Sequence, residues 1–241
     1  MSGNEAIARG AYECGARFAA GYPGTPSTEI MESFATYPGV YAEWSPNEKV
    51  AMEVGFGAAL AGAKAMVTMK HVGVNVAADP LFTASYTGTN GALVVITADD
   101  PSLHSSQNEQ DNRHYARFAK IPMLEPGDSQ EAKEYIKLAF QISEQFDTPV
   151  FLRSTTRVSH SKSVVMTEEP RKAEDRIAIR FDAEKFVMVP MNARKRRRVV
   201  EKRMQDVDKE VGPVGGLLLE GSPHKLADQS YRSHTSPLCP S

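Results

Sequence analysis

The chain has 241 residues, 41% of them hydrophobic and 24% charged, and a formal net charge of -2. The length allows one α/β domain with additional segments, or two small domains, of ordinary globular composition. The near-neutral charge argues against nucleic acid or an anionic membrane as the main partner. With only Cys14 and Cys239, the chain cannot build a disulfide framework, a zinc cluster or an iron–sulfur site by itself.

The sequence predicts neither a signal peptide nor a membrane-spanning segment. No apolar run approaches the ~20 residues that a membrane-spanning helix needs. The opening stretch MSGNEAIARGAYECG contains acidic residues and lacks the apolar core of a signal peptide. We therefore expect a cytoplasmic protein with no membrane partner.

The first part of the chain alternates between helical and strand-like patterns. Helices are predicted over 4–15, 27–38, 47–62, 74–88, 113–120 and 129–146. Strands are predicted over 17–24, 40–44, 63–70, 91–100, 121–126 and 148–156. This alternation predicts a doubly wound α/β domain over residues 1–161, with a mostly parallel sheet covered by helices on both faces. Ser27 is expected to cap the second helix, with an acidic residue nearby.

The pattern changes after residue 161, and we predict a linker over 162–211. Its first part is mixed and charged, which indicates an extended segment. Its second part predicts an amphipathic helix, because four apolar residues recur at helical spacing. These are Val200, Met204, Val207 and Val211. The basic cluster at 194–198 is compatible with nucleic-acid binding or a localisation signal, but acidic residues follow it, which favours a solvated helix joining domains.

Residues 212–241 differ again. Thirteen of these thirty residues are Gly, Pro or Ser, and no helical or strand period persists. Burial within such a segment cannot offset the entropy lost on ordering it, so we predict disorder.

Ligands of doubly wound sheets bind beyond the carboxyl ends of the strands, where four loops hold candidate residues. In GYPGTPSTE (21–29), hydroxyl groups precede a helix and could bind an anion, although a capped turn explains them as well. Glu48 opens a helix of small residues, a position that the helix dipole alone would favour. His71 follows Lys70 at the end of a strand and is equally consistent with a structural and a catalytic role. The polar loop 98–113 is either solvated or faces a ligand or subunit.

Three common nucleotide and hydrolase motifs are missing from the sequence. There is no G-x-G-x-x-G after the first strand, no G-x-x-x-x-G-K-[ST] and no G-x-S-x-G. The sequence therefore contains no motif that would indicate a dinucleotide-binding site, a P-loop or the nucleophile turn of an α/β-hydrolase.

Five long stretches carry a resemblance to a known family. They are GNEAIARGAYECG, GYPGTPSTEI, YAEWSPNEKVAMEVGFGAALAGAKAMVTMKHVGVNVAADPL, ITADDPSLHSSQNEQDNR and FAKIPMLEPGDSQEAKE. These stretches closely resemble the N-terminal part of the α subunit of indolepyruvate:ferredoxin oxidoreductase, a thiamine-diphosphate-dependent 2-oxoacid oxidoreductase. The resemblance is nearly continuous from residue 3 to about 160 and continues more weakly through FVMVPMNARKRRRVVEKR.

The resemblance implies a pyrimidine-binding domain, which holds the aminopyrimidine end of thiamine diphosphate. Glu48 lies where the family has the glutamate that shares a proton with the ring nitrogen N1′. Neighbouring Ala, Gly and Val side chains are expected to raise the pKa of this carboxyl group. Thr25 resembles a threonine that contacts the substrate carboxylate in related pyruvate enzymes. Residues expected to line the site without an assigned role are His71, Asn75, Gln107 and Asn108.

The implied reaction of the whole enzyme is oxidative decarboxylation of indolepyruvate and other arylpyruvates to aryl-acetyl-CoA, with ferredoxin as electron acceptor. Implied partners are a β subunit, ferredoxin, the 2-oxoacid and CoA, in an oligomeric assembly. The family's magnesium-binding and [4Fe–4S] motifs are absent here, so no metal ligand is predicted. We expect a truncated chain with an out-of-frame tail after residue 211, inactive by itself. A non-catalytic assembly module and a pyruvate-type 2-oxoacid oxidoreductase subunit are the alternatives.

Overall fold

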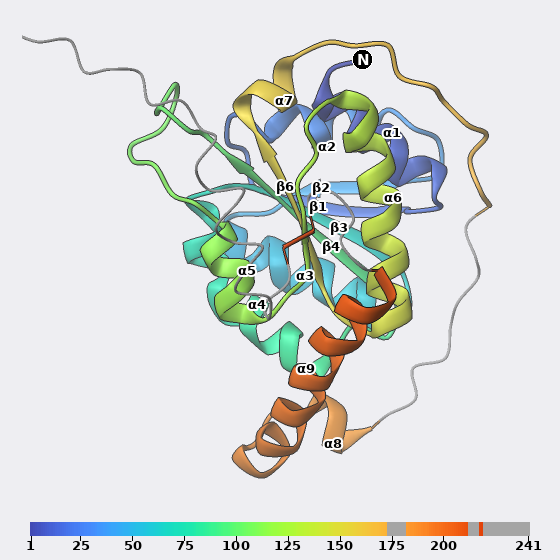
Figure 1. Cartoon of the computed structure of the whole chain (residues 1–241). Helices are drawn as coiled ribbons and strands as arrows, with labels where there is room; N and C mark the ends of the chain where they lie inside the picture. Colours follow the sequence, from blue (N-terminus) through green and yellow to red (C-terminus); the bar gives the residue numbers. More distant parts are fainter. Residues whose placement is uncertain (173–181, 212–216, 219–241) are drawn as a thin grey trace, which may run out of the picture.

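The computed structural model describes residues 1–172, 182–211 and 217–218. A seven-stranded sheet runs through it in the order β2-β1-β3-β4-β6-β5-β7 (Figure 1). The strands are β1 Phe18–Gly21, β2 Tyr41–Trp44, β3 Lys64–Lys70, β4 Ala92–Asp99, β5 Met123–Leu124, β6 Val150–Thr155 and β7 Leu217–Leu218. All neighbouring pairs are parallel except β5 and β7, which are antiparallel. The prediction of a mostly parallel sheet is confirmed.

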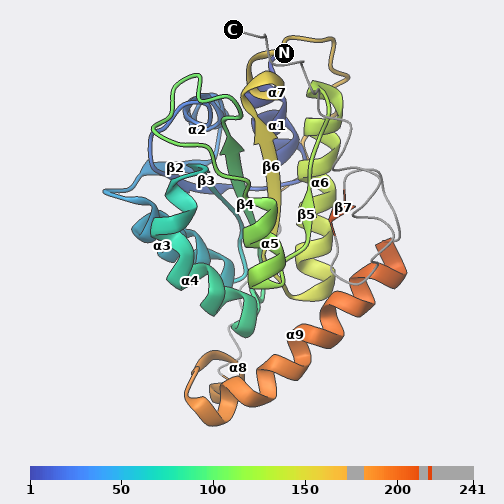
Figure 2. The ribbon, with the colours of Figure 1, turned by 60° about the vertical axis from the view of Figure 1, so that its left-hand side comes forward.

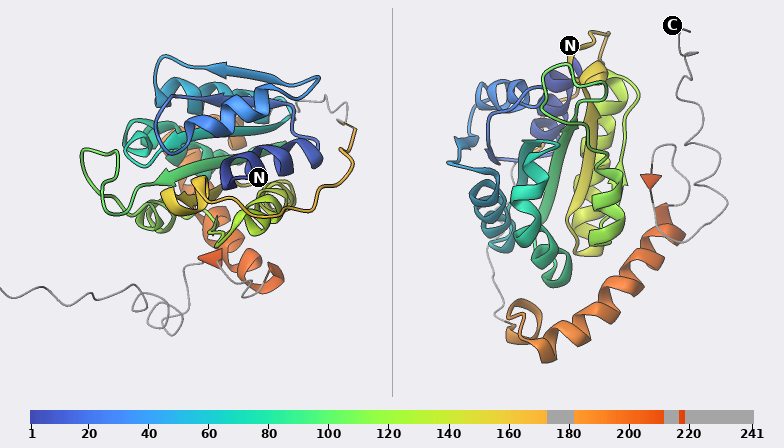
Figure 3. Two further views of the ribbon diagram at one scale, coloured as in Figure 1. Left: turned by 90° about the horizontal axis from the view of Figure 1, so that it is seen from above. Right: turned by 90° about the vertical axis from the view of Figure 1, so that its left-hand side faces the viewer.

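Helices cover both faces of this sheet (Figure 3). They are α1 Gly3–Glu13, α2 Thr28–Ala35, α3 Glu48–Leu60, α4 Gly73–Thr87, α5 Arg113–Ala119, α6 Ser129–Phe146, α7 Thr156–His160, α8 Ala183–Phe186 and α9 Pro190–Val211. Apolar residues of α1, α2 and α6 form one buried cluster with the strands, and those of α3, α4 and α5 form a second cluster. The two layers confirm the doubly wound α/β fold.

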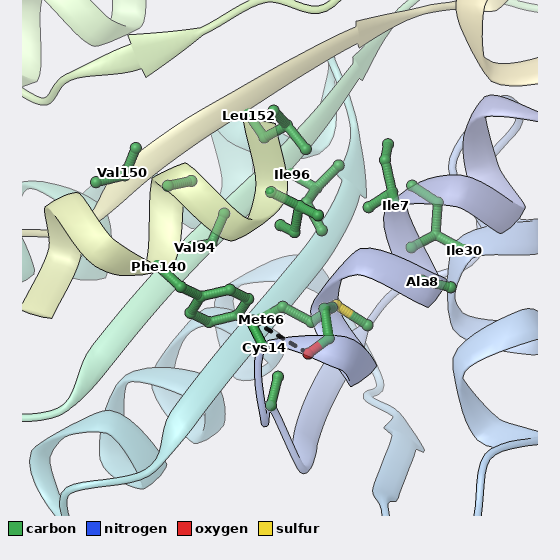
Figure 4. Packing of buried hydrophobic residues seen from close by; sticks show 14 of the residues in the cluster. Ile7, Ala8, Cys14, Ile30, Met66, Val94, Ile96, Phe140, Val150 and Leu152 are labelled. Carbon is green, nitrogen blue, oxygen red and sulfur yellow. Dashed lines mark hydrogen bonds between the residues drawn. The ribbon is translucent and has the colours of Figure 1, made fainter. Parts of the chain in front are cut away.

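The central strand β4 supplies both clusters, because successive side chains of a strand point to opposite faces. Val94 and Ile96 belong to the cluster under α1 and α6, whereas Leu93 and Val95 belong to the other. Figure 4 shows the first pair packed beside Phe140 of α6. All eight residues of β4 are buried, as expected for a strand covered on both faces.

Local details differ from the expectations at two places. The expected capping role of Ser27 is wrong, because its hydroxyl accepts no hydrogen bond from the first turn of α2 and instead donates to the carbonyl oxygen of Gly24 at 2.8 Å. The backbone angles of Ser27 are helical, whereas a capping residue usually has extended angles. The short helix α8 lies in the first part of the linker, which was expected to be an extended segment.

The predicted helix near the end of the linker is confirmed, but its expected solvated character is wrong on one face. Val200, Met204 and Val207 of α9 are buried. Arg203 donates to the carbonyl oxygen of Ser85 at 2.7 Å, and Arg196 donates to that of Tyr86 at 2.7 Å. These carbonyls belong to the last turn of α4, where a helix lacks internal donors. Figure 2 shows α9 at the end of the sheet opposite α7.

The segment that follows α7 packs along α1. The backbone N–H of Arg171 donates to the carbonyl oxygen of Glu13 at 2.9 Å. Beneath this segment, the Nζ atom of Lys133 lies 3.1 Å from a carboxylate oxygen of Glu13, with both side chains buried. Glu168, on the segment itself, also lies 3.3 Å from Lys133. A buried ion pair thus joins α1, α6 and the extended segment.

The predicted disorder over 212–241 falls outside the described residues, except for the two residues of β7. Within the described part of the chain, no helix is both long and apolar enough to cross a lipid bilayer.

Candidate functional site

The loops after β1, β3 and β4 lie next to one another, because parallel neighbours end at the same edge of the sheet. Gly21, the last residue of β1, pairs with Thr68 of β3. Lys70, the last residue of β3, pairs with Ala98 of β4. Figure 2 shows the long loop after β4 at this end of the molecule, where α7 also lies. The turn after β2, which leads to α3, lies at the same edge, because Trp44 at the end of β2 pairs with Gly21. We call this edge, with its four loops, the carboxyl edge.

Glu48 is the first residue of α3 and is half-buried. The helix begins here because the Asn47 side chain accepts a hydrogen bond from the backbone N–H of Val50 at 3.0 Å. The Glu48 carboxyl group lies against Gly73, at the start of α4. A Cβ atom built on Gly73 would stand 2.6 Å from both Cγ and Oε1 of Glu48. Within the described residues the carboxylate accepts no hydrogen bond, so its oxygens remain available to a ligand.

The loop 22–27 is rigidly held. Asn4 of α1 donates from Nδ2 to the carbonyl oxygen of Pro26 at 2.7 Å, and the Gly24 backbone N–H donates to the Thr28 hydroxyl at 3.0 Å. The Ser27 hydroxyl also bonds to Gly24, so the hydroxyls of Ser27 and Thr28 are both engaged within this turn. The Thr25 hydroxyl lies at an exposed residue and makes no hydrogen bond to the described part of the chain. This arrangement leaves the Thr25 hydroxyl to an external partner.

His71 is fully buried beneath the loop after β4. Its Nε2 atom donates to the carbonyl oxygen of Asn108 at 2.9 Å, since a carbonyl can only accept. The other ring nitrogen, Nδ1, is buried and has no partner within the described residues. Asn112 reinforces this anchor, because its Nδ2 atom donates to Asp99 Oδ1 at 3.1 Å and to the carbonyl oxygen of His71 at 3.3 Å. His71 therefore fixes the course of the loop.

Asp100 holds the other end of the same loop. Burial alone would raise the pKa of this carboxyl group, but four hydrogen bonds outweigh burial and lower the pKa below its ordinary range. The four donors are the Ser106 hydroxyl, the Ser105 backbone N–H, the Thr156 hydroxyl and the His104 backbone N–H. The loop is therefore folded around a buried carboxylate.

The charges on the neighbouring strands neutralise one another. Arg153 of β6 donates from Nε to Asp99 at 2.7 Å and also contacts Glu125. Arg113 lies 2.6 Å from Asp111. These groups are committed to internal ion pairs, in contrast to Glu48.

The sequence-predicted residues are distributed unevenly over the carboxyl edge. Glu48, Thr25 and His71 lie on adjacent loops or helix starts. Asn75 is exposed in the first turn of α4, where its Oδ1 atom accepts a hydrogen bond from the Tyr115 hydroxyl at 2.6 Å. The side chains of Gln107 and Asn108 are exposed on the loop after β4. Which of these residues touch a ligand stays a prediction.

Three positioning residues were missed in the sequence: Gly73, Asp100 and Asn112. The pair of aspartates ending a strand of apolar residues was visible as ITADD, and two acids at a buried strand end indicate an internal polar network. The role of Gly73 had no local signal, because it depends on Glu48, a residue from another helix.

Comparison with known proteins gives the family. The family described as "Pyruvate flavodoxin/ferredoxin oxidoreductase, thiamine diP-bdg" matches residues 9–211. "Indolepyruvate oxidoreductase subunit IorA" of Archaeoglobus fulgidus is 50% identical over 217 residues, which are 87% of this chain and 35% of that protein. The subunit of the same name from Pyrococcus abyssi is 54% identical over 179 residues, 73% of this chain and 28% of that protein. "2-oxoglutarate synthase subunit KorA" of Methanothermobacter marburgensis is 31% identical over 186 residues, 73% of this chain and 49% of that protein.

A solved structure shares the fold. The 2-oxoglutarate:ferredoxin oxidoreductase from Magnetococcus marinus aligns with a TM-score of 0.67 and 17% identity, over 87% of this chain and 45% of that one. The chain spans only 28–35% of the length of the indolepyruvate oxidoreductase subunits above. The resemblance to these subunits is confirmed. This chain belongs to the thiamine-diphosphate-binding domain family of the pyruvate flavodoxin/ferredoxin oxidoreductases.

Proposed function

We propose that this chain forms the pyrimidine-binding part of an indolepyruvate:ferredoxin oxidoreductase. The complete enzyme would oxidatively decarboxylate arylpyruvates to aryl-acetyl-CoA and CO₂, passing two electrons to ferredoxin. The proposal is supported by relatives of that name at 50% and 54% identity, against 31% for the 2-oxoglutarate synthase subunit. We propose that the complete enzyme also contains a partner subunit and uses CoA and ferredoxin.

The observation that carries the proposal is the placement of Glu48. Its carboxyl group is half-buried at the carboxyl edge, touches Gly73 and has no hydrogen-bond partner within the described residues. This arrangement fits an aminopyrimidine, whose ring nitrogen N1′ needs a carboxyl group with an uncommitted oxygen. A fully paired carboxylate such as Asp100 could not fulfil that role without breaking several hydrogen bonds.

Thiamine diphosphate, when bound, supplies a nucleophilic thiazolium carbon and an electron sink for decarboxylation. The part of Glu48 is to hold a proton between its carboxyl oxygen and the pyrimidine N1′, which is general acid–base work. The part of Gly73 is to leave room for that carboxyl group. The Thr25 hydroxyl, exposed at the neighbouring loop, would donate to the substrate carboxylate. His71 and Asp100 would keep the loop after β4 in place around the substrate.

The test uses the complete oxidoreductase that carries this domain. The enzyme is supplied with thiamine diphosphate, magnesium, CoA and ferredoxin or a viologen dye, and kcat/KM is measured for indolepyruvate, phenylpyruvate, pyruvate and 2-oxoglutarate. We expect the two aryl substrates to be preferred by at least tenfold. A preference for pyruvate or 2-oxoglutarate would replace the substrate assignment. If none of these 2-oxoacids led to reduction of ferredoxin or the dye, the proposed function would be wrong.

A further inference from the structure

We propose that Lys70 binds the carboxylate of the anionic substrate at the carboxyl edge. This inference deepens the proposed function, because it rests on a 2-oxoacid being the substrate. It assigns recognition of the substrate charge to the last residue of β3, in addition to the hydroxyl of Thr25.

Lys70 lies between the two loops that border the site. Its strand, β3, lies between β1 and β4 in the sheet. The side-chain stem packs against Gly24 of the first loop, where an added Cβ atom would stand 3.0 Å from Lys70 Cβ. The Nζ atom donates to the carbonyl oxygen of Ser105 in the loop after β4 at 2.7 Å. Lys70 thus holds its ammonium group at the junction of the loop that carries Thr25 and the loop that carries Gln107.

The charge of Lys70 is not neutralised within the described part of the chain. No carboxylate there lies within 4.0 Å of its Nζ atom, the limit for the ion pairs described above. Asp99 at the end of β4 is paired with Arg153, Asp100 in the following loop accepts four hydrogen bonds, and Asp111 is paired with Arg113. Glu109 of the same loop accepts a hydrogen bond from the backbone N–H of Ser102. An ammonium group has three donors, and Ser105 takes one of them. Two donors and a full positive charge remain for an anion.

The position relative to Glu48 suits a bound 2-oxoacid. Glu48 contacts Gly73, the first residue of α4, which lies three residues after Lys70 at the end of β3. The two uncommitted charges of opposite sign therefore flank one short turn. A substrate that places its keto carbon near the cofactor carries its carboxylate on the adjacent atom, and a cation close to this turn is placed to form a charge-assisted hydrogen bond with that carboxylate.

A purely structural role for Lys70 is the competing explanation. In that case Lys70 only ties the loop after β4 to β3 through Ser105. Loss of this hydrogen bond would weaken the binding of every ligand of the site equally, whether the ligand is charged or neutral. Loss of a carboxylate-binding group would weaken the binding of charged ligands alone. The two roles therefore differ in a measurable ratio.

The experiment compares a charged and a neutral probe that lack the keto group and cannot react. Binding of 3-phenylpropionate and of 3-phenylpropanamide to the complete enzyme is measured by calorimetry, for the wild type, Lys70→Met, Lys70→Arg and Arg157→Met. Met keeps the length of the stem on Gly24. Arg157 is an exposed cation on α7, after β6, and controls for a general loss of positive charge at this edge.

We expect Lys70→Met to weaken the binding of 3-phenylpropionate by ~10–100-fold, the usual range for a hydrogen bond to a charged group. The binding of 3-phenylpropanamide should weaken by less than about threefold. Lys70→Arg should retain most of the preference for the acid, and Arg157→Met should leave it unchanged. A wild type that does not prefer the acid, or a Lys70→Met variant that loses both probes equally, would overturn the proposal. Because no turnover is needed, the result is independent of the oxidoreductase assay. Failure of that assay with intact acid preference would remove the proposed reaction alone.

Discussion

The carboxyl group of Glu48 rests on the α-carbon of Gly73, so that a Cβ atom at residue 73 would stand 2.6 Å from Oε1. The two residues are the first residues of two different helices, α3 and α4. Glycine at 73 is not required by its backbone angles, since its φ lies outside the left-handed region. With the Glu48 side chain in this position, residue 73 has no room for a Cβ atom.

The first prediction follows from this contact. Gly73→Ala should displace the Glu48 side chain without unfolding the protein, because the nearest atoms that an added Cβ would meet all belong to that flexible side chain. Misplacing a reacting group by about 1 Å can cost ~10²-fold in rate. We therefore expect deuterium exchange at C2 of bound thiamine diphosphate to slow by that order in the complete enzyme.

A matched substitution controls for stability. Gly57→Ala changes an exposed position of α3, where an added Cβ atom meets no other atom within 4 Å. For both variants, the midpoint of urea unfolding should lie at or above the urea concentration found for the wild type. Unchanged C2 exchange in Gly73→Ala would show that the Glu48 contact does not position a functional group.

Most of the fold was predictable because its elements are locally encoded. The continuous apolar run of β4 is bounded by Gly91 and two aspartates, and the apolar residues of α6 recur at helical spacing, so both signals lie within the segments themselves. The docking of α9 was not predictable, because Arg196 and Arg203 find their acceptors in the last turn of α4, more than a hundred residues earlier in the chain. The basic cluster looked solvated because sequence spacing cannot reveal a tertiary acceptor.

The second prediction concerns the buried pair Lys133 and Glu13. Burial would raise the pKa of Glu13, but hydrogen bonds from Arg9, the Glu168 backbone N–H and Lys133 lower it. Removing one partner of a buried pair costs ~3–5 kcal/mol. We expect Lys133→Met to lower the free energy of unfolding by about 3 kcal/mol, at the low end because Arg9 still contacts Glu13.

Urea unfolding of this chain provides the measurement, with Glu13→Gln/Lys133→Met as the compensating double variant. The double variant should regain at least half of the loss, because no unpaired carboxylate stays buried. A loss below about 1 kcal/mol in Lys133→Met, the value of a surface ion pair, would contradict the buried character of this network.

The third prediction uses the lowered pKa of Asp100. A carboxyl group with a lowered folded pKa adds stability that is present above its unfolded pKa, about 3.9, and is lost as the pH falls toward the folded value. Asp100→Asn should therefore be less stable than the wild type at pH 7, by ~1.5–3 kcal/mol. The difference should shrink as the pH is lowered below about 4. Chemical unfolding across this pH range tests the sign, and a difference that grows on acidification would refute it.

The fourth prediction concerns the docking of α9. Burial lowers the pKa of Arg203 to about 10, so the guanidinium remains charged at neutral pH while it donates to the carbonyl oxygen of Ser85. Arg203→Met should cost about 1–3 kcal/mol by leaving a buried acceptor unsatisfied. Amide hydrogen exchange in α9 should accelerate. Arg198→Met, at an exposed position of the same helix, should leave exchange unchanged. Equal exchange in both variants would mean that Arg203 does not anchor α9.

The candidate site was predictable only in part. Glu48 and Thr25 came from the resemblance, and the structure shows that both lie at the carboxyl edge with side chains uncommitted within the described residues. His71 was open between two roles from its position alone, and its buried contact with Asn108 makes it an anchor of the loop. Lys70 directly precedes His71, but the sequence could not show that Lys70 has no ion-pair partner within the described residues. That finding depends on the tertiary contacts of the neighbouring acids.

The most direct test of the account is Glu48→Gln in the complete enzyme, with thiamine diphosphate saturating. The change is nearly isosteric, and a carboxylate at the start of a helix contributes only ~0.3–1 kcal/mol through the dipole, so the fold should persist. An amide cannot share a proton with N1′, so deuterium exchange at C2 of the bound cofactor should slow by ~10²–10⁴-fold. Exchange in Glu48→Gln within about threefold of the wild type, below this acid–base range, would contradict the role of Glu48.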